Sequence, residues 1–231
     1  MRLLNRLSGW VVIGLLVASP EIAFADHCRS KAVPGVDWRD CNKRMLVLKN
    51  VDLSGANLSG VNFTASDLSK ANLLLANLEE ATLVRSLLEK SNAVGVNFTR
   101  VEGFRADFSG IDANGARFVS AELQRARFSN ADLSEVDFTK AELGRSRFDG
   151  AVLSGNRFKL ANLARADFRQ AKVLGSLDFE GAYFFLTRIG GVNLSSATSL
   201  KQSQVDMACG DEMTTLPAGL KTPKSWPCPL D

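Results

Sequence analysis

The sequence predicts an all-β solenoid with a covalently closed cap at each end. Three observations support this prediction: apolar residues recur every five positions through most of the chain, arginines recur every twenty, and the four cysteines lie in two pairs near the ends. The composition is that of a folded globular protein, with 45% hydrophobic and 23% charged residues and a formal net charge of +3. That near-neutral balance disfavours a dedicated nucleic-acid-binding protein.

Residues 1–25 have the features of a secretory signal peptide. Two arginines precede an apolar run from Trp10 to Val17, and Ala23-Phe24-Ala25 supplies the small residues of a cleavage site between Ala25 and Asp26. An uncleaved membrane anchor is disfavoured because the apolar run is shorter than the ~20 residues that a membrane span needs. We therefore expect a mature chain that is periplasmic or secreted and has no integral membrane segment.

In an exported protein the four cysteines are expected to form disulfides. Cys28 and Cys41 lie near one end of the mature chain, and Cys209 and Cys228 lie near the other. An oxidising compartment favours disulfides, and four cysteines allow three connectivities. Pairing within each end is the simplest arrangement, because a rigid middle would hold the ends far beyond the ~7 Å reach of a disulfide. Zinc binding is disfavoured because neither pair has the short spacing of a zinc site.

The middle of the chain restarts every five residues from Leu46 onward, as in VDLSG, ANLSG, VNFTA and SDLSK. The central residue of each block is almost always Leu or Phe, and a small residue stands two positions before it. Because alternate side chains of an extended segment share one face, each block is expected to form a short extended piece followed by a turn. Such blocks wind into a β-solenoid. We expect it to cover residues 46–196, between an N-terminal cap (26–45) and a C-terminal cap (197–231).

The A-(D/N)-(L/F)-x-x blocks, such as Ala131-Asp132-Leu133 and Ala161-Asn162-Leu163, resemble the pentapeptide-repeat family. The resemblance covers roughly residues 46–196 and implies a right-handed quadrilateral β-helix with four blocks, or twenty residues, per coil. Family members of the quinolone-resistance type resemble duplex DNA in shape and negative charge and bind DNA gyrase. That activity is not carried over, because this rod is near neutral and its leader directs it away from gyrase.

A coil of twenty residues places the central phenylalanines in two columns on opposite walls. One column is expected to contain Phe98, Phe118, Phe138 and Phe158, and the other Phe108, Phe128, Phe148 and Phe168. Burial of each ring stabilises the fold by roughly 2–3 kcal/mol. One extra residue near Gly175-Ser176 is expected to shift the register once.

Charged residues also form columns at this spacing. The first contains Arg85, Arg105, Arg125, Arg145 and Arg165; a second contains Glu102, Glu122 and Glu142; a third contains Asp107, Arg127, Arg147 and Asp167. We expect a lattice of ion pairs between neighbouring coils, each pair contributing little on a solvated surface.

The sequence predicts that this protein is not an enzyme. His27 is the single histidine, and the carboxylates precede central residues, where the repeat points side chains outward. A smooth prism lacks the cleft in which paired carboxylates acquire different pKa values. We therefore expect no catalytic, cofactor-binding or metal-binding residues, and no cofactor.

One stretch departs from the repeat. Ala93 and Gly103 occupy central positions on opposite walls of one coil and would leave a void, so Phe104 is expected to turn inward and fill it. If it does not, it joins an outward apolar patch. The members of that patch would be Val84, Leu87 and Phe104, with a second patch, Leu74, Leu75 and Val94, on another wall. Exposed apolar patches indicate contact with a partner or self-association.

These observations favour a non-catalytic, exported structural or protein-binding module of the cell envelope, whose partner the sequence does not identify. The alternative is a periplasmic ligand- or glycan-binding protein that uses one prism face. It is disfavoured because glycan binders present aromatic platforms, and here nearly every aromatic residue falls on a buried central position. A DNA mimic that binds a topoisomerase is the least favoured alternative, since it requires an uncleaved cytoplasmic product.

Overall fold

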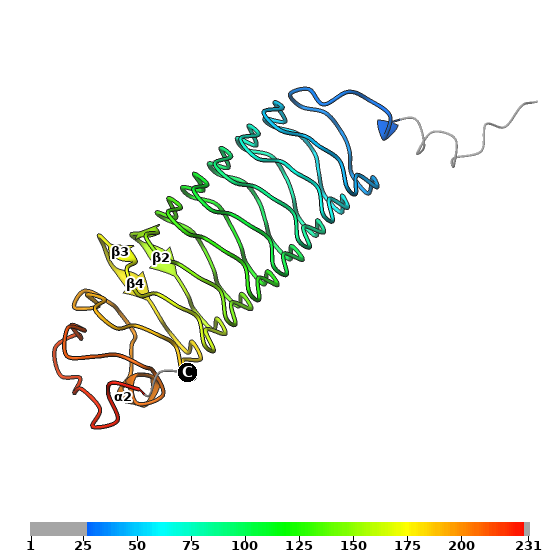
Figure 1. Cartoon of the computed structure of the whole chain (residues 1–231). Helices are drawn as coiled ribbons and strands as arrows, with labels where there is room; N and C mark the ends of the chain where they lie inside the picture. The colour runs from blue at the N-terminus through cyan, green and yellow to red at the C-terminus, as the bar shows by residue number, and fades with distance from the viewer. Residues whose placement is uncertain (1–26, 229–231) are drawn as a thin grey trace, which may run out of the picture.

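The computed structural model describes residues 27–228, which form a long rod of stacked coils (Figure 1). The expected cleavage site between Ala25 and Asp26 lies outside the described residues. Regular elements are short: β1 (Val152–Leu153), β2 (Asn156–Arg157), β3 (Lys172–Val173), β4 (Leu177–Asp178) and the helical turn α2 (Gln202–Val205). No helix within residues 27–228 is long and apolar enough to cross a membrane.

The coils pair with one another in parallel. β1 pairs with β3 and β2 with β4, one coil apart. Up to the pair of Arg147 with Asp167, the coils are joined by isolated parallel bridges between residues twenty positions apart, such as Asn57 with Asn77 and Asn77 with Asn97, and most later bridges join residues 21 or 22 positions apart. The period of twenty agrees with the expected four blocks per coil. The expectation of an all-β chain needs one correction, because α2 lies at the C-terminal end, where the five-residue pattern has ended.

A backbone turn at every fifth residue sets this geometry. Within one coil, Leu75, Glu80, Arg85 and Lys90 all have φ between +56° and +59°. Each turn is closed by a hydrogen bond from the residue after the corner to the central residue, as from the amide of Ala81 to the carbonyl of Leu78 (3.0 Å). The Asp or Asn of the repeat accepts a second one, as Asp52 does from the amide of Ser54 (2.9 Å). The consensus Asp or Asn is therefore a turn-forming residue.

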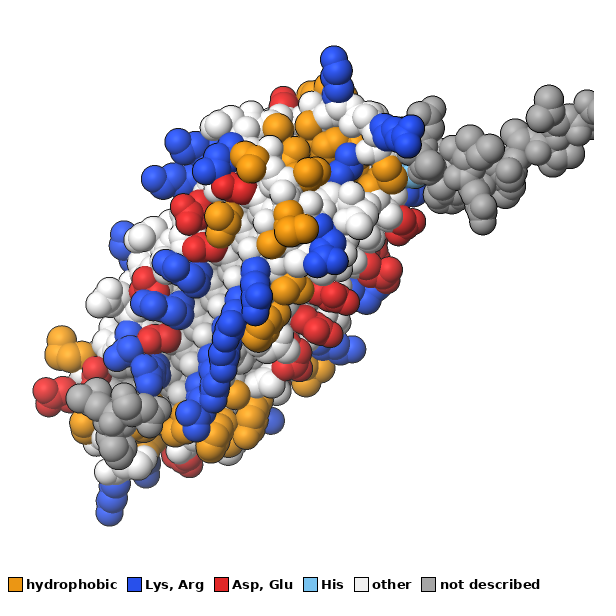
Figure 2. Space-filling model, turned by 45° about the vertical axis from the view of Figure 1, so that its right-hand side comes forward, with side chains coloured by type: hydrophobic (Ala, Val, Ile, Leu, Met, Phe, Trp, Pro, Cys, Tyr) orange, Lys and Arg blue, Asp and Glu red, His pale blue; other side chains and the backbone are white. Residues whose placement is uncertain are grey.

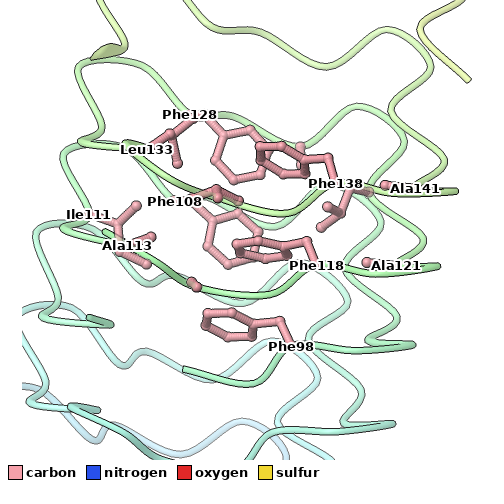
Figure 3. Close-up of a cluster of buried hydrophobic side chains, with 14 of the residues drawn as sticks. Phe98, Phe108, Ile111, Ala113, Phe118, Ala121, Phe128, Leu133, Phe138 and Ala141 are labelled. Atoms are coloured by element: carbon pink, nitrogen blue, oxygen red, sulfur yellow. The ribbon is translucent and has the colours of Figure 1, made fainter. Parts of the chain in front are cut away.

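From Phe98 to Phe168 the core contains two ring columns on opposite walls (Figure 3), whereas leucines fill most central positions before Phe98. Within a column the rings stack face to face with centroids 4.4–5.3 Å apart. Between columns they meet edge to face at 5.6–6.4 Å. This is the arrangement that the alternation of phenylalanines predicts, and Phe158 continues it by stacking on Phe179 (5.3 Å).

The expectation that Phe104 turns inward is wrong. Its side chain is 37% exposed, whereas Ala93 is fully buried. Leu123 from the next coil and the edge of Phe108 occupy the space instead, since a Cβ on Gly103 would lie 2.8 Å and 3.8 Å from their side chains. An inward turn would break the corner, where the amide of Arg105 donates to the carbonyl of Gln124 (3.1 Å).

The register shift expected near Gly175 lies between β3 and β4, and further shifts follow in the C-terminal cap, where Arg188 pairs with Cys209 and Asn193 with Thr215. Asn156 pairs with Leu177, a separation of 21 residues, whereas β1 and β3 keep the separation of 20. The extra residue therefore falls between 173 and 177. Asn156 stands at an inward position normally held by a small residue, and its Nδ2 donates to the carbonyl of Leu133 (2.6 Å).

Both ends of the rod are covered by irregular chain. Bridges begin with Asp37 to Asn57, so coil pairing starts inside the segment assigned to the N-terminal cap. In the C-terminal cap the buried Gln204 of α2 donates from Nε2 to the carbonyls of Phe179 (2.9 Å) and Ala182 (2.8 Å). Trp226 donates from Nε1 to the carbonyl of Ala208 (2.7 Å). These contacts satisfy carbonyl groups that the last coil would leave unpaired.

Phe128→Ala is expected to lower the free energy of unfolding by about 3–5 kcal/mol, because it removes a buried ring that packs against four others. Phe104→Ala is the matched control and is expected to cost about 1 kcal/mol or less. Denaturant unfolding of both variants measures the difference. Equal losses would mean that Phe104 is a core residue after all.

Candidate interaction surfaces

Both cysteine pairs form disulfides within their own ends. Cys28 bonds to Cys41 and Cys209 to Cys228, each with a Cα–Cα distance of 5.4 Å. The one group of metal-ligand side chains found among residues 27–228 is His27 with Cys28 and Cys41. Because both sulfur atoms are used in the disulfide, no thiolate is left there to bind zinc.

A buried lysine holds the N-terminal cap against the first coil. Lys43 is only 8% exposed, its Nζ donates to the carbonyl of Cys28 (2.6 Å), and it stands 3.7 Å from the centre of the Trp38 ring. Burial lowers the pKa of Lys43. Sequence reasoning missed this contact, because Lys43 stands at a central position, which Leu or Phe fills in almost all of the repeat blocks from Leu46 onward.

Among the described residues, several aspartates have lowered pKa values, and the causes are structural hydrogen bonds and ion pairs. The pKa of Asp52 is lowered chiefly by the hydrogen bond from the amide of Ser54. Burial alone would raise the pKa of Asp137, but hydrogen bonds from Thr139 and the guanidinium of Arg157 lower it. A catalytic carboxylate pair needs one acid with a raised pKa. The pKa values of these aspartates are lowered instead, because their carboxylates accept hydrogen bonds in the turns.

The C-terminal cap contains a pocket of about 580 Å³ beside the Cys209–Cys228 disulfide. Its charged lining groups are engaged: Arg169 and Arg188 both pair with the carboxylate of Asp167. Asp211 accepts hydrogen bonds from the amides of Gly191 (2.9 Å) and Met213 (3.0 Å). The contact between Asp211 and Gly191 joins the cap to the last coils.

The two expected apolar patches lie on different corners of the prism. Leu75 and Arg85 are corner residues two blocks apart in a coil of four blocks, so their corners are diagonally opposite. Leu74, Leu75 and Val94 therefore cannot share one surface with Val84, Leu87 and Phe104. The six residues form two separate surfaces.

The first surface is the leucine corner, defined as Leu74, Leu75 and Val94 on a column of glycine turns. Leu75 is 67% exposed and Leu74 36%, whereas Val94 is half-buried. Glycine follows in the same column because a Cβ at Gly95 would lie 2.7 Å from Leu75 Cδ2. The corner is thus a small apolar projection between coils whose corner residue is glycine.

The second surface is the arginine corner. Its residues occupy one column of left-handed turns, joined coil to coil by backbone hydrogen bonds, and are Met45, Ala65, Arg85, Arg105, Arg125, Arg145, Arg165 and Leu186. All five arginines are exposed. Val84, Leu87 and Phe104 lie next to them, and the Arg105 guanidinium stands over the Phe104 ring at 5.2 Å. Figure 2 shows a straight line of basic side chains along the rod.

The expected ion-pair lattice forms only in part. Arg127 pairs with Asp107 (3.4 Å) and Arg157 with Asp137 (3.1 Å), each one coil apart. Arg100 pairs with both Glu79 and Glu80. Within residues 27–228, however, none of the five arginines of the arginine corner makes an ion pair, and neither do Glu102, Glu122 or Glu142. The lattice prediction is therefore wrong for these two columns, because their side chains leave different parts of the prism.

The sequence matches the family model of pentapeptide repeats, in eight copies, over residues 47–85, 83–118 and 116–155. No curated protein matches the sequence significantly.

Solved structures of pentapeptide repeat proteins are similar at low identity. HetL, which is involved in heterocyst differentiation regulation in the cyanobacterium Nostoc sp. strain PCC 7120, is 21% identical, with 85% of this chain and 92% of that chain covered and a TM-score of 0.36. Full-length QnrB1, a plasmid-mediated fluoroquinolone resistance protein, is 16% identical over 78% and 91%, with a TM-score of 0.47. A thylakoid lumen protein of Arabidopsis thaliana is 24% identical over 54% and 69%, with a TM-score of 0.20. Since these TM-scores lie below 0.5, the fold is assigned from the parallel bridges and the left-handed turns of this chain itself.

Lys43→Met is expected to flatten the dependence of stability on pH in alkaline solution. Because the pKa of Lys43 is lowered in the folded protein from 10.5, the unfolded chain binds more protons between the two values. The free energy of unfolding of the wild type should therefore rise relative to that of the variant as the pH rises from the lowered pKa of Lys43 towards 10.5. Urea unfolding at several pH values measures this difference. A difference that stays constant or falls would contradict the buried position of the ammonium group.

Proposed function

Because this chain belongs to the pentapeptide repeat family, we propose that it is an exported, non-catalytic structural or protein-binding module of the cell envelope. The family fold, a right-handed quadrilateral β-helix, suits such a role because its walls are regular and its corners are free to vary. The observation that supports binding most directly is the leucine corner. Leu75 projects from a column in which glycine occupies the neighbouring coils.

Two features support export. Residues 1–25 have the pattern of a signal peptide. Both cysteine pairs of the described part are bridged, and no free cysteine is found there. Structural disulfides of this kind persist in oxidising compartments such as the periplasm.

A protein partner fits the leucine corner better than a glycan does. Apolar side chains that project into water favour contact with an apolar surface, whereas a glycan binder needs an aromatic platform. Tyr183 and Phe185 are the two exposed rings that stack on each other in the described part, at 6.2 Å, and they lie far along the rod. We therefore keep the ligand- or glycan-binding function as the second candidate. A topoisomerase-binding DNA mimic is not proposed, because the chain is not acidic.

Intact-mass measurement of the protein released from the periplasm tests export. The expected mass is that of residues 26–231 with two disulfides, and reduction with alkylation should then label four cysteines. A full-length mass with four free thiols would overturn the export proposal.

Replacing Leu74 and Val94 with lysine is expected to abolish any complex that depends on the leucine corner. The measurement is cross-linking in intact cells, followed by detection of the partner with this chain. The melting temperature should stay near that of the wild type, because Leu74 is exposed and Val94 half-buried.

The matched control replaces Ser54 and Asn114 with lysine. These residues flank Leu74 and Val94 in the same column, so the added charge and the position on the prism are equivalent. The control should keep the complex. A complex that survives the Leu74 and Val94 changes, or is lost equally in the control, would show that the leucine corner is not the binding surface.

A further inference from the structure

The arginine corner combines two features on one straight edge. In its middle, five arginines stand at successive coils, about 4.8 Å apart by the spacing of parallel strands. Like charges at this distance repel one another, and within residues 27–228 none of the five arginines forms an ion pair with a carboxylate. A long line of cations without counter-charges indicates an anionic surface as its partner.

The two ends of the same edge are apolar. Met45 begins the corner and is 73% exposed, with Val47 beside it 78% exposed. At the other end Leu186 occupies the corner position, preceded by Phe185, which is 43% exposed and stacks on Tyr183. Figure 2 shows hydrophobic side chains alongside the line of basic ones and near both of its ends. From Met45 to Leu186 the corner spans seven coil steps, or about 34 Å.

We propose that the arginine corner lies on an anionic lipid surface, with the rod parallel to the membrane plane. Guanidinium groups bind lipid phosphates through paired hydrogen bonds. The apolar residues at the two ends then enter the region between headgroups and acyl chains, where exposed aromatic and aliphatic side chains are stabilised. This arrangement provides partners for both the charged and the apolar side chains of the edge.

The geometry favours a membrane over a soluble polyanion. A polyanionic chain in water neutralises the arginines but leaves Met45 and Val47 exposed. A lipid surface contacts the arginines and these apolar side chains together. The glutamate column of Glu102, Glu122 and Glu142 lies on the adjoining wall, three residues before each corner position. Its repulsion from lipid phosphates keeps that wall away from the membrane, so the rod contacts the surface along its edge.

Vesicle sedimentation tests the proposal, with the exported chain and two lipid compositions. Vesicles of phosphatidylcholine with one-third phosphatidylglycerol should bind the protein, and salt should weaken this binding. Vesicles of phosphatidylcholine alone measure the binding that does not depend on anionic lipid. Changing Arg105, Arg125 and Arg145 together to glutamine should weaken binding to the anionic vesicles about tenfold or more.

The matched control changes Lys70, Lys90 and Lys140 to glutamine. These lysines also occupy left-handed corner turns and make no ion pair in the described part, but they stand on other corners. This control removes the same charge and should retain most of the binding. A third variant, Met45→Ser with Phe185→Ser, should weaken vesicle binding several-fold and leave binding to the soluble polyanion dextran sulfate unchanged. Unfolding midpoints near that of the wild type verify the fold of all three.

Three results would overturn the proposal. The wild type could bind anionic vesicles no better than neutral ones, or the lysine control could lose as much binding as the arginine variant. In the third, the arginine variant loses dextran sulfate binding while the Met45 and Phe185 variant keeps full vesicle binding. The edge would then recognise negative charge alone, and its ligand would be a soluble polyanion.

Discussion

The left-handed turn at every fifth residue is the constraint on which the rest of the structure depends. It bends the chain at fixed intervals, so that residues twenty positions apart form parallel bridges. The turn is stabilised locally, by the hydrogen bond across the corner and by the Asp or Asn side chain, which accepts a hydrogen bond from the amide two residues later in the same block. Because each turn is local and each bridge joins neighbouring coils, stability accumulates coil by coil along the rod.

This constraint also decides where functional chemistry can occur. Central side chains are committed to the core, small side chains to the inward position beside it, and Asp or Asn to the turn. The corner residue and the residue before it remain free, which is why both candidate surfaces of this protein are corners. Lowered aspartate pKa values belong to the same scheme, because a turn that donates amides to a carboxylate stabilises its charged form.

The sequence predicted the repetitive part of the fold well, since each block reports the same local geometry. The ring columns and the register shift near Gly175 follow from spacing, and the pairing of cysteines within each end follows from the rigid middle that separates the two ends. Prediction failed where one residue depends on a neighbouring coil. Phe104 stays outside because Leu123 already fills the space at Gly103. The insertion of Gln204 between two carbonyl groups depends on the path of an irregular cap, for which the repeat offers no pattern.

The positions of the two corners connect the two proposals. The leucine corner and the arginine corner are separated by half a coil, so they face in opposite directions across the prism. A rod that lies on a membrane along its arginine corner therefore presents Leu74 and Leu75 to the aqueous side. Either surface can be altered without the other, because core columns rather than surface contacts join the corners. A protein of this design would hold a partner at a fixed height above the lipid, set by the width of the prism.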